Sequence, residues 1–222
     1  MNKFIFGAKS QAPSNTKLTN GYTLFEWAMR QHCFPAFWGR SISEKNKITK
    51  DEIDFLSEKD CKILLIFDNL TEISVSSNNG ANDAENAIES LEKLKVPKYK
   101  NIAVFAEIQD EWSVNHNWMI SFAEILRHNG YIPGFIGNTD SSLNFNFNRQ
   151  FSHYKEAGFD AVCCATKPET TETIYEWKPY APSTMNPNDI LLWQNQTKEL
   201  NGVKYNFVHA RNNDILKYTW AI

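Results

Sequence analysis

Residues 101–112 read NIAVFAEIQDEW, an apolar run that ends abruptly in acidic residues. Ile102, Val104 and Phe105 have the β-branched and aromatic character of a buried strand, and Glu107 follows at its C-terminal end. Helical patterns precede and follow this strand, so the stretch is the centre of a β/α unit. In parallel α/β folds, the residues after the strands build the active site. Glu107 is therefore the first candidate for chemistry, and a solvated loop acid is the alternative.

The same unit recurs along the chain. Capping boxes at Thr23–Glu26 and Thr49–Glu52 predict the start of two helices, and residues 82–96 and 113–128 have one apolar face. The remaining strands are expected at 3–8, 34–38, 61–67, 131–136, 159–164, 190–193 and 203–208. This alternation predicts a (β/α)8 TIM barrel that is irregular in its later units, because residues 166–189 form a long loop with four prolines. A doubly wound open sheet is the alternative, weakened by the lack of a Gly-rich phosphate loop.

Length and composition limit the classes of protein and partner. A chain of 222 residues fits one domain over residues 1–222. Charged residues make up 22% and the net charge is −3, so nucleic acid is not an expected partner. No apolar run reaches the roughly 20 residues of a membrane span, and the N-terminus lacks a signal-peptide core, which predicts a cytoplasmic protein or export by a non-classical route. The four cysteines have no metal-ligand spacing, so neither a metal nor a cofactor is expected.

Several longer motifs occur in a specific order. They are FGAKSQAPS at 6–14, FWGRSI at 37–42, ITKDEIDFLSEKDCKILLIF at 48–67, GANDAENAIESLEKLKVP at 80–97, GYIPGFIGN at 130–138 and LLWQNQ at 191–196. With these motifs the chain resembles the glycoside hydrolase-like barrels of domain-of-unknown-function family 1906, distant relatives of the family-25 lysozymes. The resemblance covers nearly the whole chain. It implies a TIM barrel and hydrolysis of a glycan such as peptidoglycan.

The acids of that family are only partly present. Its first strand normally ends in Gly-x-Asp, where this chain has Lys9, and its fourth strand keeps one carboxylate here, Glu107. Near the eighth strand, Asn206 stands in place of an acid. Glycoside hydrolysis needs two carboxyl groups, so we assign Glu107 as the acid/base and Asp68, after the third strand, as its partner. A cation at Lys9 opposes a protonated acid, and a Lys9–Glu107 ion pair in a degraded site is the alternative.

Further polar and aromatic residues follow the predicted strands. The candidates for substrate binding are Lys9, Trp38, Arg40, Trp193 and Gln194. The indoles would stack on sugar rings, and the polar groups would bind hydroxyls; alternatively the two tryptophans close the top layer of the barrel. We expect Lys9, Trp38 and Trp193 to line one pocket with the two carboxylates at the C-terminal ends of the strands.

Two functions fit these observations. The first is a glycoside hydrolase-like enzyme that acts on a bacterial cell-wall glycan or related polysaccharide. The second is the same barrel with a degraded site, which binds a glycan or a protein partner without hydrolysis. Fold analogy does not separate the two. The sequence does not determine the oligomeric state.

Overall fold

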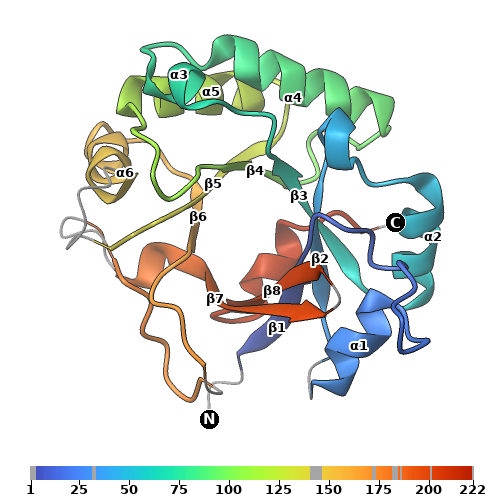
Figure 1. Ribbon diagram of the computed structural model, residues 1–222. Coiled ribbons are helices and arrows are strands. Elements are labelled where there is room, and N and C mark those ends of the chain that lie inside the picture. The colour runs from blue at the N-terminus through green and yellow to red at the C-terminus, as the bar shows by residue number, and fades with distance from the viewer. Residues whose placement is uncertain are drawn as a thin grey trace.

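A computed structural model describes residues 4–31, 34–140, 147–171, 174–181, 185, 187–200 and 202–221. Its eight strands form a closed barrel in the order of the sequence, which confirms the predicted fold class (Figure 1). The strands are β1 (Ile5–Lys9), β2 (Phe37–Ser41), β3 (Lys62–Phe67), β4 (Ala103–Glu107), β5 (Ile132–Gly137), β6 (Val162–Ala165), β7 (Ile190–Leu200) and β8 (Val203–Ala210).

Helices surround the ring of strands (Figure 1). They are α1 (Leu24–Arg30), α2 (Lys50–Glu58), α3 (Glu72–Ser76), α4 (Ala81–Lys93), α5 (His116–His128) and α6 (Phe147–Glu156), with short 3-10 helices η1 (Glu44–Asn46), η2 (Pro187–Asp189) and η3 (Asn213–Lys217). No helix among the described residues is long and apolar enough to cross a membrane. The stretch SVSSNNG at 74–80 is typical of a loop because of its serines, asparagines and glycine, yet its first three residues belong to α3.

The last strand differs from the ideal repeat. Strands β1 to β7 pair in parallel, whereas β8 is antiparallel to both β7 and β1. A short turn joins β7 to β8, and a hairpin connection of this kind requires antiparallel strands. The irregularity expected in the later units is therefore a hairpin that closes the barrel. Beyond the mouth, this hairpin continues to Leu200 and Val203.

Alternate residues of each strand form two apolar layers. Phe37, Leu64 and Phe105 belong to the layer inside the barrel, and Ala8, Leu65 and Val104 belong to the layer between strands and helices. At two positions the inner phenylalanines fill space that only a glycine leaves: a Cβ on Gly7 would lie 2.3 Å from the Phe37 ring, and one on Gly134 would lie 2.6 Å from Phe105. The interior below the mouth is thus a packed core, as is usual for this fold.

Candidate functional site

At the mouth of the barrel, each strand has one inward-facing polar residue next to its inward-facing apolar residues. Side chains alternate along a strand, so the residue two positions beyond an inward apolar residue also points inward. The inward polar positions are Lys9, Ser41, Asp68, Glu107, Asn138, Thr166, Gln194 and Asn206. All except Gln194 and Asn206 lie at the C-terminal ends of parallel strands or just beyond them, and Gln194 follows the last residue of β7 that pairs with β6.

An open cleft of about 570 Å³ lies at this mouth. It is lined by Lys9–Pro13, Ser41, Asn46, Ile66, Asp68, Glu107, Thr197, Gly202–Lys204 and Asn206. The structure therefore brings together three of the predicted site residues, Lys9, Asp68 and Glu107. Phe67 pairs with Ala106, so the two carboxylates occupy adjacent positions on neighbouring strands.

Lys9 and Glu107 form an ion pair between β1 and β4. The Lys9 side chain is 9% exposed and the Glu107 side chain 22%, so the pair lies at the floor of the cleft. Asp68 accepts a hydrogen bond from the Ser41 hydroxyl at 2.6 Å, and no cation pairs with it among the described residues. The two carboxylates therefore have different partners, a cation for Glu107 and a hydroxyl for Asp68.

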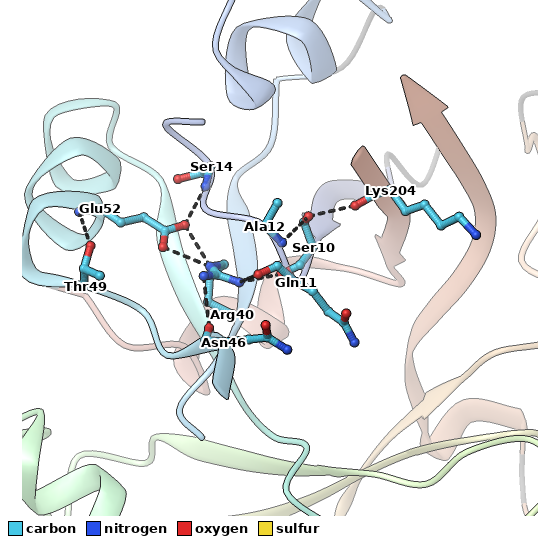
Figure 2. A network of polar contacts seen from close by, with 9 residues as sticks. All are labelled: Ser10, Gln11, Ala12, Ser14, Arg40, Asn46, Thr49, Glu52 and Lys204. Atoms are coloured by element: carbon cyan, nitrogen blue, oxygen red, sulfur yellow. Dashed lines mark hydrogen bonds and ion pairs between the residues drawn. The ribbon is translucent and has the colours of Figure 1, made fainter. Parts of the chain in front are cut away.

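Arg40 has a structural position that the sequence did not predict. Its side chain is 1% exposed and lies on the outer face of β2, where Nε donates to both carboxylate oxygens of Glu52 at 2.9 and 3.0 Å. The two remaining nitrogens donate to the backbone carbonyls of Ser10, Gln11 and Asn46 (Figure 2). The prediction that Arg40 faces the pocket is wrong, because its nitrogens are already engaged with the protein.

Glu52 explains why the second capping box is incomplete. Thr49 accepts a hydrogen bond from the Glu52 backbone, as a cap should, but the Glu52 carboxylate turns away from the Thr49 backbone. It binds Arg40 and the backbone N–H of Ser14 at 2.6 Å instead (Figure 2). In the box at Thr23, both reciprocal bonds form. The Arg40–Glu52 ion pair therefore connects α2 and β2 to the loop that walls the cleft.

Both predicted tryptophans lie outside the cleft. Trp38 is fully buried on the outer face of β2, with its ring 5.6 Å from that of Phe25. Trp193 is 2% exposed, donates to the Pro168 carbonyl at 2.9 Å, and packs against Trp177. The prediction that they line the pocket is wrong, because strand alternation turns both toward the outer layer. Their alternative role in core packing describes these positions.

Gln194 points into the barrel but is not among the residues that line the cleft. The sequence pointed to Asn206 but did not predict the wall that the hairpin forms around it with Thr197 and Lys204. The Ser10 hydroxyl donates to the Lys204 carbonyl at 2.8 Å and links this wall to the loop after β1. The available signal was that polar residues are spread through positions 195–206 with no apolar run. This pattern is typical of a strand that extends beyond the barrel and no longer buries one whole face.

The thiols and the metal-ligand residues suggest no further chemistry at the mouth. Burial raises the pKa of Cys164 to about 12, and Cys163, on the opposite face of β6, also has a raised pKa because it is buried. Such thiols remain protonated and unreactive. Across the described ranges, no group of three or more His, Cys, Asp or Glu side chains is placed to hold a metal ion.

Solved structures share this barrel. An uncharacterized protein of B. stearothermophilus superposes with a TM-score of 0.78 at 25% identity, over 97% of this chain and 100% of that chain. A Tat-secreted protein of Mycobacterium tuberculosis, solved in complex with HEPES, gives 0.65 at 12% identity over 97% and 98%. The catalytic domain of an endolysin from a Listeria monocytogenes bacteriophage gives 0.55 at 12% identity over 97% of each chain. No protein-family model and no curated protein matches the chain.

These likenesses show the fold, which is also that of an endolysin catalytic domain. At such identities they do not transfer an activity or a ligand. The function must be argued from the cleft itself.

Proposed function

We propose that this protein is a glycoside hydrolase-like barrel that binds a bacterial cell-wall glycan or related polysaccharide in the cleft, with Glu107 as acid/base and Asp68 as its partner. The observation that carries the proposal is the placement of these two carboxylates on neighbouring strands in one open cleft. Parallel strands lie about 4.8 Å apart, so both groups can reach one glycosidic bond. The resemblance to family 1906 barrels supports the same substrate class.

The described residues that line the cleft include no aromatic side chain. Recognition would therefore rest on hydrogen bonds rather than on stacking. Asn46 and Asn206 supply amides, Ser10 and Thr197 supply hydroxyls, and the carboxylates accept from sugar hydroxyls. Lys9 and Gln194 keep their proposed roles in substrate binding, Lys9 beside Glu107 and Gln194 deeper in the mouth.

The Lys9–Glu107 ion pair favours a second candidate function, binding without hydrolysis. A general acid must hold a proton, and a neighbouring cation favours the ionised carboxylate. Unless the ligand separates Lys9 from Glu107, the cleft has a base and lacks an acid. The barrel would then hold a glycan and leave its glycosidic bonds intact.

One experiment separates these functions. Purified protein is incubated with peptidoglycan and a panel of polysaccharides, and both sedimentation of the protein with the glycan and release of new reducing ends are measured. Hydrolysis that is lost in Glu107→Gln and Asp68→Asn supports the enzyme. Sedimentation without new reducing ends, weakened by Asp68→Asn, supports the binding protein. The proposal would be refuted if the protein neither bound nor hydrolysed any glycan of the panel.

A further inference from the structure

The Lys9–Glu107 ion pair divides the mouth of the barrel. It joins β1 to β4, and because the strands follow in order around a closed barrel, β2 and β3 lie on one side of the pair and β5 to β7 on the other. The open cleft contains the inward residues of the first side, Ser41 and Asp68, and it also reaches Thr197 and Asn206 of the β7–β8 hairpin. The inward polar residues of β5 to β7 lie outside its lining. They form the second half of the mouth, in which Asn138 and Thr166 are buried and Gln194 is half-buried.

Among these three residues, two buried atoms lack hydrogen-bond partners. Asn138, 1% exposed, accepts a hydrogen bond from the Asp140 backbone at its Oδ1, 2.9 Å away, and this bond fixes the orientation of the amide. Its Nδ2 is buried and unpartnered, and so is the Oε1 of Gln194. One atom is a donor and the other an acceptor.

The register explains why these two atoms do not bind each other. Gly137 pairs with Ala165 and Ala165 with Trp193, so Asn138, Thr166 and Gln194 occupy one row on three successive strands. The Cα atoms of Asn138 and Gln194 are therefore roughly 9 to 10 Å apart. Thr166, between them, donates instead to Asp110 at 3.2 Å. Folded proteins rarely keep a buried donor and a buried acceptor unpaired, unless a ligand or a water satisfies them.

We propose that Asn138 and Gln194 form a buried subsite for a secondary amide of the ligand, such as the acetamido group of an amino sugar. Asn138 Nδ2 donates to the amide carbonyl, and Gln194 Oε1 accepts from the amide N–H. A free ammonium has donors only, and so leaves Asn138 unsatisfied. The ligand reaches the subsite by parting Lys9 from Glu107, which borders both halves. This inference rests on the proposed function and extends it to ligand selectivity.

Calorimetric titration with three oligosaccharides of equal length tests the subsite. The probes are oligomers of N-acetylglucosamine, of glucosamine and of β-1,4-linked glucose, which differ at one substituent of each ring. The variants are Gln194→Met, which removes the acceptor at similar volume, and Asn138→Asp, which keeps the acceptor for Asp140 and removes the donor. Gln196→Met is the matched control, because Gln196 lies on the same strand and donates to Thr171 at the surface.

We expect the wild type to prefer the acetylated oligomer by about tenfold or more, the value of one or two hydrogen bonds to a buried polar group. Both variants should lose this preference because their affinity for the acetylated oligomer falls, and Gln196→Met should keep the preference. The thermal midpoint of Gln194→Met should not fall, because the variant removes an unsatisfied acceptor. Equal wild-type affinities, or a preference that survives both variants, would refute the subsite alone. Failure of all three oligomers to bind would refute the subsite and count against the proposed function as well.

Discussion

Lys9 is the residue on which the chemistry of the cleft depends. It forms an ion pair with Glu107 at the floor of the cleft, where the proposed hydrolase needs a proton donor. Replacing Lys9 by aspartate would exchange this ion pair for a pair of acids. The same packed barrel supports either arrangement, because Lys9 lies above the apolar core and not within it.

We predict that the wild type has little glycosidase activity and that Lys9→Asp gains some. Two neighbouring carboxylates favour sharing one proton, which supplies the acid that the ion pair lacks. Release of reducing ends from peptidoglycan is the measurement. Lys204→Asp, at another lysine of the cleft, is the matched control and should gain nothing. Robust wild-type hydrolysis that survives Glu107→Gln would contradict the assignment of Glu107.

His209 gives the fold a dependence on pH. It lies against Phe6, with Nδ1 2.8 Å from Asn195 Oδ1, and burial lowers its pKa to about 4. The unfolded chain binds a proton near pH 6.5 and the folded chain does not, so stability is complete above pH 6.5 and falls as the pH is lowered toward 4. We predict that the free energy of unfolding falls by up to about 3 kcal/mol between pH 6.5 and 4.

Urea unfolding at several pH values measures this loss. His209→Gln keeps a donor for Asn195. In this variant the free energy of unfolding should change much less between pH 6.5 and 4. His128→Gln, at an exposed histidine, is the control and should leave the pH dependence unchanged. An equal slope in the wild type and in His209→Gln would contradict the prediction.

At the scale of elements, the Arg40–Glu52 ion pair fixes one wall of the cleft. We predict that Arg40→Met lowers the free energy of unfolding by about 3–5 kcal/mol, because it leaves the Glu52 carboxylate buried without its cation. The double variant Arg40→Met/Glu52→Met should lose less than the sum of the two single variants, which urea unfolding measures. Lys47→Met, at an exposed ion pair with Glu44, is the control and should change little. A double variant whose loss equals the sum of the two single losses would contradict the coupling between Arg40 and Glu52.

The elements show what the sequence could and could not predict. The apolar run before Glu107 and the capping box at Thr23 depend on local patterns, and both predictions are confirmed by β4 and α1. Which face of a strand a residue occupies depends on register, and the second strand was expected at 34–38 and begins at Phe37. Because of this difference, the sequence did not predict that Trp38 and Arg40 point outward and Ser41 points inward. The hairpin wall depends on the direction of β8, which no local pattern encodes.

At the scale of the whole molecule, the two ends of the barrel differ. The lower end is closed by residues after β8: Ile215 enters the inner core, and the backbone of Trp220 exchanges two hydrogen bonds with Ile63. The upper end carries the polar ring and the cleft. The proposed binding site and these stabilising contacts thus lie at opposite ends, as is usual for this fold. Changes at the upper rim can therefore alter binding while the core stays intact.

The hairpin tip tests this separation. Lys198 pairs with Tyr205, so replacing residues 199–204 by Asn-Gly closes the hairpin directly at this pair with a favoured two-residue turn. The tip is mostly exposed, and its loss removes the cleft wall at Gly202–Lys204 and the acceptor of Ser10. We predict cooperative thermal unfolding with a modestly lower midpoint, and a loss of glycan sedimentation. Ser10→Ala, which removes the link and keeps the wall, should weaken sedimentation less. A shortened protein that sediments like the wild type would show that the glycan does not occupy this cleft, because no ligand seated there could avoid the missing wall.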